Sequence, residues 1–187
     1  WLKILRGGRP VYYLADLCKL SGLSVDSMRR AAQRLVGQGL LHKAGKEIYL
    51  NALMPMGIEE LAVILYRPCY ILMESALFYH GIITQAPFVN TCVTPRATRN
   101  MITPLGEIIY QHIKPTLYFG YKKSGGFFLA EAEKAALDFV YLNLQNGHRP
   151  HLDEWDWTQL SLKRLKHYAK KYPQSVKTFM LPYLKNS

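Results

Sequence analysis

The stretch SVDSMRRAAQRLVGQGLL, residues 24–41, combines an amphipathic helical pattern with three arginines. Its apolar residues recur at the spacing of one helix face, so the pattern predicts a helix with one buried stripe. The stripe consists of Val25, Met28, Ala32, Leu35 and Val36. Ser24 is a favourable N-cap, Asp26 lies in the first turn, and Gly37 and Gly39 are expected to end the helix.

A second helix is predicted just before this stretch, in YLADLCKLSGLS at residues 13–24. We expect Leu14, Leu17 and Leu20 to face inward from it. The helix ends at Ser21-Gly22, where two small residues permit the close crossing of a helix-turn-helix. The two helices are therefore expected to pack across a tight turn.

A basic hairpin is predicted after the stretch, in LLHKAGKEIYL at residues 40–50. Residues 40–42 and 48–50 have strand character, and Lys43-Ala44-Gly45-Lys46 contains a glycine suited to a turn. A helix, a tight turn, a helix and a basic hairpin occur in this order in a winged helix-turn-helix. The sequence predicts such a domain over residues 1–52, with an incomplete first helix.

The long predicted helix turns a set of polar side chains away from the stripe. Arginine can bind guanine or phosphate through two hydrogen bonds, glutamine can pair with adenine, and serine can reach a backbone phosphate. Asp26 is the only acid on this face, whereas a merely solvated face usually mixes charges of both signs. The residues expected to contact DNA are Ser24, Ser27, Arg29, Arg30, Gln33, Arg34, Lys43 and Lys46. A solvated helix face and a winged helix that contacts protein remain as alternatives.

Positive charge is concentrated at the two ends of the chain, whose net charge is +11 over 187 residues. Residues 1–50 carry nine Lys or Arg against three Asp or Glu, and residues 121–187 carry eleven against six. Residues 51–120 have four of each. Such a distribution favours a polyanionic partner, and double-stranded promoter DNA fits the predicted domain.

The remaining bulk features point to a cytoplasmic protein. No apolar run has the length of a membrane-spanning helix, so no membrane partner is expected, and residues 1–10 lack a secretory leader pattern. Cys18, Cys69 and Cys92 form no CxxC pair and are interpreted as reduced core thiols.

Residues 53–187 are predicted to form a mixed α/β second domain with a C-terminal helical segment, which makes the whole chain α+β. The pattern indicates helices at 75–81, 131–145 and 160–172, and a terminal apolar segment at 175–184. Strands are expected at 88–94, 107–113, 116–121 and 127–130, with a polar connection at 95–106.

No catalytic residue, metal site or cofactor is expected. The sequence contains no P-loop, dinucleotide fingerprint, HExxH or nucleophile elbow, and its histidines lack metal-ligand spacing. His80 is interpreted as structural. Glu131 and Glu133 precede Lys134, but Ala132 occupies the position that the acid-x-Lys pattern of a nuclease requires. We expect an ion pair between Glu131 and Lys134 instead. The core side of this helix is predicted to be Ala135, Ala136, Phe139, Val140 and Leu142.

Three segments of the second domain resemble AbiEi antitoxins, which act with nucleotidyltransferase toxins in bacterial abortive-infection operons. They are ESALFYHGIITQAPFVNTCVT (74–94), EIIYQHIKPTLYFGY (107–121) and AEAEKAALDFVYL (130–142). The N-terminal pattern YLADL…SGLS…RLVGQGLL matches the family's layout as well. The resemblance implies that the winged helix represses its own operon. It also implies that the second domain counters the nucleotidyltransferase toxin, without requiring direct contact with it.

The last amphipathic helix predicts a second basic surface. Its buried stripe would be Leu162, Leu165, Tyr168, Ala169 and Tyr172. The outward residues would be Lys163, Arg164, Lys166, Lys170 and Lys171. A solvated helix, a phosphate-binding surface and a docking face for an acidic partner or RNA all fit this pattern.

Two other functions stay open on the sequence alone. The first is a nuclease or nucleotide-modifying enzyme that finds its substrate through the winged helix. Its metal site would be built from Glu74, Glu131, Glu133 or Asp138. The second is a repressor that senses a small molecule in the aromatic-rich second domain.

Overall fold

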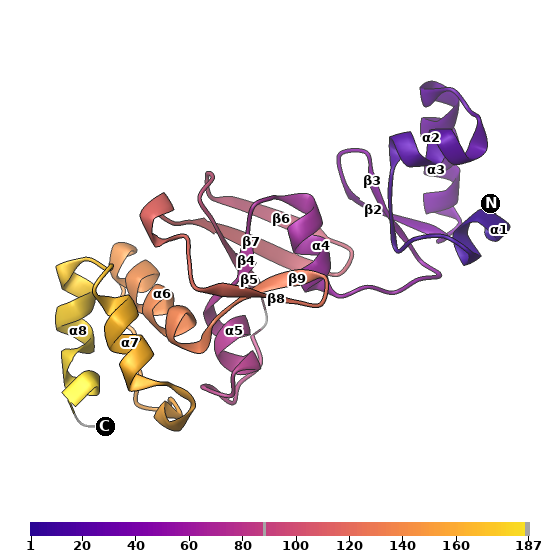
Figure 1. The fold of residues 1–187 in the computed structure, drawn as a ribbon. Helices are drawn as coiled ribbons and strands as arrows, with labels where there is room; N and C mark the ends of the chain where they lie inside the picture. The colour runs from indigo at the N-terminus through magenta and orange to yellow at the C-terminus, as the bar shows by residue number, and fades with distance from the viewer. Residues whose placement is uncertain (88, 186–187) are drawn as a thin grey trace. The chain divides into compact units, whose positions relative to one another are not determined.

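A computed structural model describes residues 1–87 and 89–185 of the chain (Figure 1). Contacts divide the chain into two compact units. Unit 1 comprises Trp1–Leu61 and Met101–Glu107, and unit 2 comprises Ala62–Asn100 and Ile108–Ser187. Helices and two separate sheets are both present, so the predicted α+β class is confirmed.

Unit 1 contains the predicted pair of helices and the hairpin. Its elements are α1 (Leu2–Arg6), β1 (Val11–Tyr13), α2 (Leu14–Ser21), α3 (Val25–Gly37), β2 (Leu41–Gly45) and β3 (Ile48–Asn51). The strands form an antiparallel sheet in the order β1-β3-β2. The predicted turn at Lys43–Lys46 is wrong. Strand β2 continues to Gly45 with an irregular register after Lys43, and Lys46 and Glu47 make the turn.

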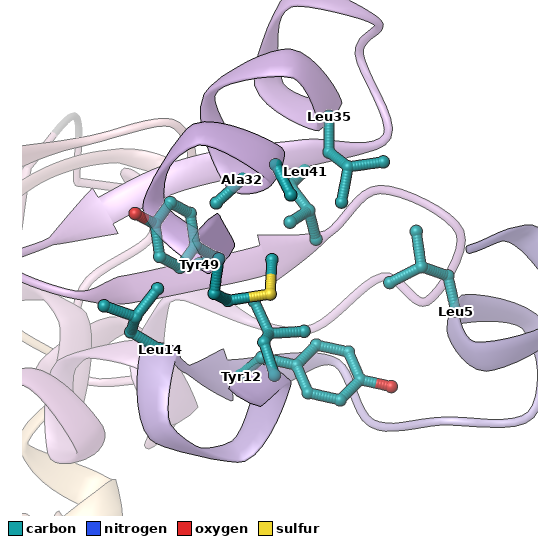
Figure 2. Close-up of a cluster of buried hydrophobic side chains, with 10 residues drawn as sticks. Leu5, Tyr12, Leu14, Ala32, Leu35, Leu41 and Tyr49 are labelled. Atoms are coloured by element: carbon teal, nitrogen blue, oxygen red, sulfur yellow. The ribbon is translucent and has the colours of Figure 1, made fainter. Parts of the chain in front are cut away.

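The core of unit 1 lies between α2, α3 and the sheet (Figure 2). Helix α3 contributes Met28, Ala31, Ala32 and Leu35, α2 contributes Leu14 and Leu17, and the remaining members are Leu5, Tyr12, Leu41 and Tyr49. Burial of these apolar groups is the main force that holds α2 against α3 and the sheet.

Three residues predicted to be inside are exposed: Leu20, Val25 and Val36. With 100° between successive residues, Leu20 is turned about 120° from Leu14, which takes it off the buried face of α2. Val25 and Val36 lie at the edge of the buried face of α3, about 60–80° from Met28. Ala31, about 60° from Met28 on the opposite side, is buried although the predicted stripe left it out.

Unit 2 is built on most of a six-stranded sheet with the strand order β6-β7-β5-β4-β9-β8. The strands are β4 (Tyr70–Ile71), β5 (Asn90–Thr94), β6 (Arg99–Thr103), β7 (Gly106–His112), β8 (Tyr121–Ser124) and β9 (Phe127–Ala130). β5 runs parallel to β7, and β4 runs parallel to β9. The pairs β4–β5 and β8–β9 are antiparallel.

The helices from residue 58 onward are α4 (Ile58–Leu65), α5 (Met73–Tyr79), α6 (Ala132–Gln145), α7 (Leu162–Ala169) and α8 (Gln174–Lys185). Two short 3₁₀ helices, η1 and η2, cover Pro115–Leu117 and Trp157–Gln159. Helix α6 packs against α5, α7 and α8 (Figure 1). Within the described residues, no helix is long and apolar enough to cross a membrane.

Two strand predictions need correction. The strand predicted at 116–121 is absent, because Pro115 opens the η1 turn and Gly120 has φ +69, so that β8 begins only at Tyr121. The polar connection predicted at 95–106 contains β6, an edge strand whose side chains are mostly exposed. Phe88, the first residue of the strand predicted at 88–94, lies outside the described residues.

Helix α6 carries three buried charged side chains: Glu133, Lys134 and Asp138. The predicted ion pair between Glu131 and Lys134 is wrong, because Lys134 points into the core and pairs with Asp138 one turn later. Leu165, Ala169 and Tyr172 are buried as predicted, and Leu162 and Tyr168 are half-buried. Phe139, predicted in the core, is also half-buried.

Candidate nucleic-acid interface

The start of α3 is fixed by local hydrogen bonds. Gly22 ends α2 in the left-handed region, with φ +71, and its N–H donates to the Cys18 carbonyl over 2.9 Å. The Ser24 hydroxyl accepts from the Ser27 N–H at 3.4 Å, which confirms Ser24 as the N-cap. Ser24 also donates to the Ser27 hydroxyl over 3.0 Å. Both serines are therefore engaged in holding the helix end.

The polar residues of α3 gather around two open hollows on the surface of unit 1. The first is lined by Ser27, Arg30, Gln33 and Arg34. The second lies between α3 and the hairpin and is lined by Arg29, Gln33, Val36, Lys43, Lys46, Glu47 and Tyr49. Because Gln33 lines both hollows, the helix and hairpin residues form one continuous surface, which we call the α3 surface.

Arg29 differs from the other arginines of the α3 surface. Its Nη1 lies 3.2 Å from Asp26 Oδ1, and its Nη2 lies 2.8 Å from Glu47 Oε1. Hydrogen bonding to Glu47 is the main reason why the pKa of Arg29 is raised. Arg30 and Arg34 are exposed and have no ion pair with any carboxylate in the described part of the chain.

The hairpin brings two lysines and one acid to the α3 surface. Lys43 and Lys46 are exposed. Glu47 occupies the left-handed region with φ +58, and its carbonyl accepts a hydrogen bond from the Leu14 N–H over 2.8 Å. This bond ties the turn to the first residue of α2. The place of Glu47 on this surface was not predicted from the sequence, because Gly45 suggested a turn at residues 43–46.

Tyr49 also lines the second hollow, where charged neighbours act on its phenol. Burial and the nearby Glu47 carboxylate raise the pKa of the Tyr49 phenol, and Arg29 opposes this shift. The α3 surface contains five cationic groups and the Glu47 carboxylate, and the neighbouring Asp26 carboxylate contacts Arg29. The surface therefore has a positive balance, and its negative charges are confined to the surroundings of Arg29.

The second basic surface lies on α7. Ser161 caps the helix by accepting from the Arg164 N–H at 3.5 Å. A hollow is lined by Ser161, Lys163, Arg164, Lys166, His167 and Lys170. Arg164 is not fully available, since its Nη1 lies 3.4 Å from the Glu133 carboxylate. The Lys171 ammonium lies 4.0 Å from the centre of the Phe119 ring.

Of the acidic residues considered for a nuclease, Glu131, Glu133 and Asp138 are engaged by other partners. Lys122 Nζ lies 2.7 Å from Glu131 Oε1, and the Tyr168 hydroxyl donates to the other Glu131 oxygen. Glu133 accepts from the Ser161 N–H over 2.9 Å. Asp138 is fully buried against Lys134. Across residues 1–87 and 89–185, no three His, Cys, Asp or Glu side chains gather into a group that could hold a metal ion.

Two titrating groups near α7 are shifted by this arrangement. Burial would raise the pKa of Glu131, but hydrogen bonds from Lys122 and Tyr168 outweigh it and lower that pKa below its ordinary value. The hydrogen bond to Glu131, with burial, raises the pKa of Tyr168 to about 12.

His80 has the structural place predicted for it, with Nε2 2.7 Å from the Ala130 carbonyl oxygen.

In comparisons with known proteins, no family model and no curated protein matches the chain.

Proposed function

We propose that residues 1–52 are a winged helix-turn-helix that binds double-stranded DNA through the α3 surface. The observation that carries this proposal is the gathering of Arg29, Arg30, Arg34, Lys43 and Lys46 around two hollows that share Gln33. A helix fits the major groove of duplex DNA, where arginine and glutamine can address guanine and adenine edges. A merely solvated helix has no need for a second basic element beside it.

The two elements have different roles in this proposal. Helix α3 enters the major groove, with Gln33 toward base edges and Arg30 and Arg34 toward the flanking phosphates. Lys43 and Lys46 on the β2–β3 hairpin bind phosphates, because lysine is a compact charge suited to contacts that do not depend on sequence. Ser24 mainly holds the start of α3, and Ser27 can still turn its hydroxyl toward a phosphate.

We further propose that the chain is a cytoplasmic autorepressor and antitoxin, the function that the resemblance to AbiEi antitoxins implies. Repression would result from binding of the α3 surface to the promoter of its own operon. Unit 2 would counter a nucleotidyltransferase toxin, with or without direct contact. No cofactor is part of this proposal.

Binding to duplex DNA tests the first half of the proposal. Fluorescence anisotropy of a labelled duplex from the region upstream of the gene is measured at several salt concentrations. Arg30→Ala with Arg34→Ala should weaken binding at least tenfold, with a flatter salt dependence. The matched control, Lys114→Ala with Lys123→Ala, removes two exposed charges from elsewhere in the chain and should bind like the wild type. Equal loss in both variants would reject the α3 surface.

Growth and reporter assays test the second half. A reporter under the upstream region should be repressed by the wild type and released by the Arg30, Arg34 double variant. Co-expression with a neighbouring nucleotidyltransferase gene should restore growth that the toxin alone arrests. Repression without rescue would leave a repressor only and would reject the antitoxin role.

A further inference from the structure

The α3 surface contains one group of charges that adds nothing to its attraction for phosphate. Asp26, Arg29 and Glu47 are linked through the two terminal nitrogens of Arg29, at 3.2 and 2.8 Å. One cation and two carboxylates give these three residues a negative balance. A phosphate placed here would face two carboxylates, whereas Arg30 and Arg34 present unpaired charges nearby.

Glu47 is held in place without any help from DNA. Its backbone has φ +58, and its carbonyl is bound by the Leu14 N–H. Glycine or asparagine would adopt this backbone conformation more readily than glutamate. The turn alone therefore does not account for an acid at this position, and the contact of the Glu47 carboxylate with Arg29 does.

Arginine has five N–H donors. Asp26 contacts one terminal nitrogen of Arg29 and Glu47 contacts the other, so further N–H donors remain for a ligand. The contacts with Asp26 and Glu47 at both terminal nitrogens restrict the orientation of the guanidinium and thus of its remaining donors. Guanine presents two acceptors, N7 and O6, on its major-groove edge, and arginine is the side chain that pairs with both. A tethered, charge-compensated arginine is thus suited to reading a base and poorly suited to binding phosphate.

We propose that Asp26 and Glu47 are positioning residues that make Arg29 the guanine-reading side chain of the α3 surface. This inference rests on the proposed DNA binding and assigns different roles to the residues of the α3 surface. Arg30, Arg34 and the hairpin lysines supply affinity for any duplex. Arg29 supplies sequence preference, and Glu47 keeps that preference high by preventing Arg29 from acting as a free cation.

The test compares two arginine variants with the wild type. Each protein is titrated with one mixed-sequence duplex at several salt concentrations, and each is used to select from a random duplex library that is then sequenced. Arg30→Ala should reduce the log–log salt slope by about 0.9, the value for one lost phosphate contact. Arg29→Ala should leave the slope nearly unchanged and remove a guanine preference from the selected sequences.

Glu47→Gln tests the positioning role directly. Losing this carboxylate should tighten binding to the mixed-sequence duplex severalfold, steepen its salt slope by about one unit and weaken the guanine preference. Glu154→Gln is the matched control, because it changes the charge equally at an exposed position of unit 2. Asp26→Asn gives a second, independent variant should Glu47→Gln lower the unfolding midpoint.

The outcomes separate this inference from the proposed function. A wild-type protein that binds no duplex rejects the proposed function itself. The inference alone is overturned if the wild type binds duplex DNA and Arg29→Ala flattens the salt slope as Arg30→Ala does while keeping the guanine preference. The positioning role of Glu47 is overturned if Glu47→Gln behaves like Glu154→Gln in both assays.

Discussion

The buried pair Lys134–Asp138 provides the most demanding test of the architecture of unit 2. Both side chains are fully buried. Asp138 also accepts hydrogen bonds from the Tyr172 hydroxyl over 2.6 Å and from the Tyr70 hydroxyl over 2.8 Å. Burial lowers the pKa of Lys134 and raises that of Asp138, and each partner opposes the shift of the other. The two charges are therefore tolerated in the core only together.

Replacing one partner leaves the other buried without compensation. Asp138→Asn keeps the shape of the side chain and removes its charge, and Lys134→Met removes the ammonium. Each change should lower the free energy of unfolding of unit 2 by about 3–5 kcal/mol. With a urea dependence of about 2 kcal/mol per molar, the unfolding midpoint should fall by about 1.5–2.5 M. The double variant should lose clearly less than the sum of the two single variants, because it contains neither isolated charge.

Tryptophan fluorescence in urea measures this effect. Trp155 is buried, and its ring lies 5.5 Å from that of Phe139 on α6, so its emission reports on the packing of unit 2. Lys163→Met is a suitable control, since it makes the same replacement at an exposed site on α7 and should shift the midpoint little. Single losses below 1 kcal/mol, or losses that add within about 0.5 kcal/mol in the double variant, would refute the coupling.

Three further predictions concern stability. Glu131→Gln should destabilise the protein more at pH 7 than at pH 3 in urea titrations. A carboxyl whose folded pKa is lowered stabilises the protein above its ordinary pKa of 4.5, and this effect is lost as the pH falls through the folded pKa. An equal loss at both pH values would contradict this. Gly22→Ala should lower the free energy of unfolding by about 1 kcal/mol in thermal melts. Its positive φ alone causes this loss, since a Cβ there has open space. Gly37→Ala in α3 is the control and should be neutral or stabilising. Asn51→Asp should lower the free energy of unfolding by about 2–3 kcal/mol in urea titrations. The reason is that the buried Nδ2 of Asn51 donates to the carbonyls of Leu5 and Arg9 over 2.8 and 3.1 Å. A smaller loss than the same replacement causes at an exposed asparagine would reject this role.

Local patterns account for what could be predicted of unit 1. The cap at Ser24, the corner at Gly22 and the core positions Met28, Ala32 and Leu35 all depend on residues close together in the sequence. The position of the hairpin turn was not predicted correctly. Gly45 marks the irregularity in β2, and the turn is held by the hydrogen bond from Leu14 to Glu47, which sequence spacing alone does not contain.

Long-range contacts explain what escaped prediction in unit 2. The environment of Asp138 depends on Tyr70 and Tyr172, which lie 68 and 34 residues away along the chain. Without them, a lysine one turn after Glu131 suggests a surface ion pair. The same holds for the α3 surface, where its basic character was predicted and the pairing of Arg29 with Glu47, 18 residues later, was not.

We propose that the α3 surface lies against the bases of duplex DNA, and a site-directed crosslink can test this placement. Gln33, which lines both hollows, is replaced by a photoreactive benzophenone amino acid, and the protein is irradiated with a labelled duplex from its upstream region. We expect an efficient crosslink from position 33 and none from Gln145, an exposed glutamine of α6 given the same replacement. A bound duplex that crosslinks from position 145 and not from position 33 would contradict it.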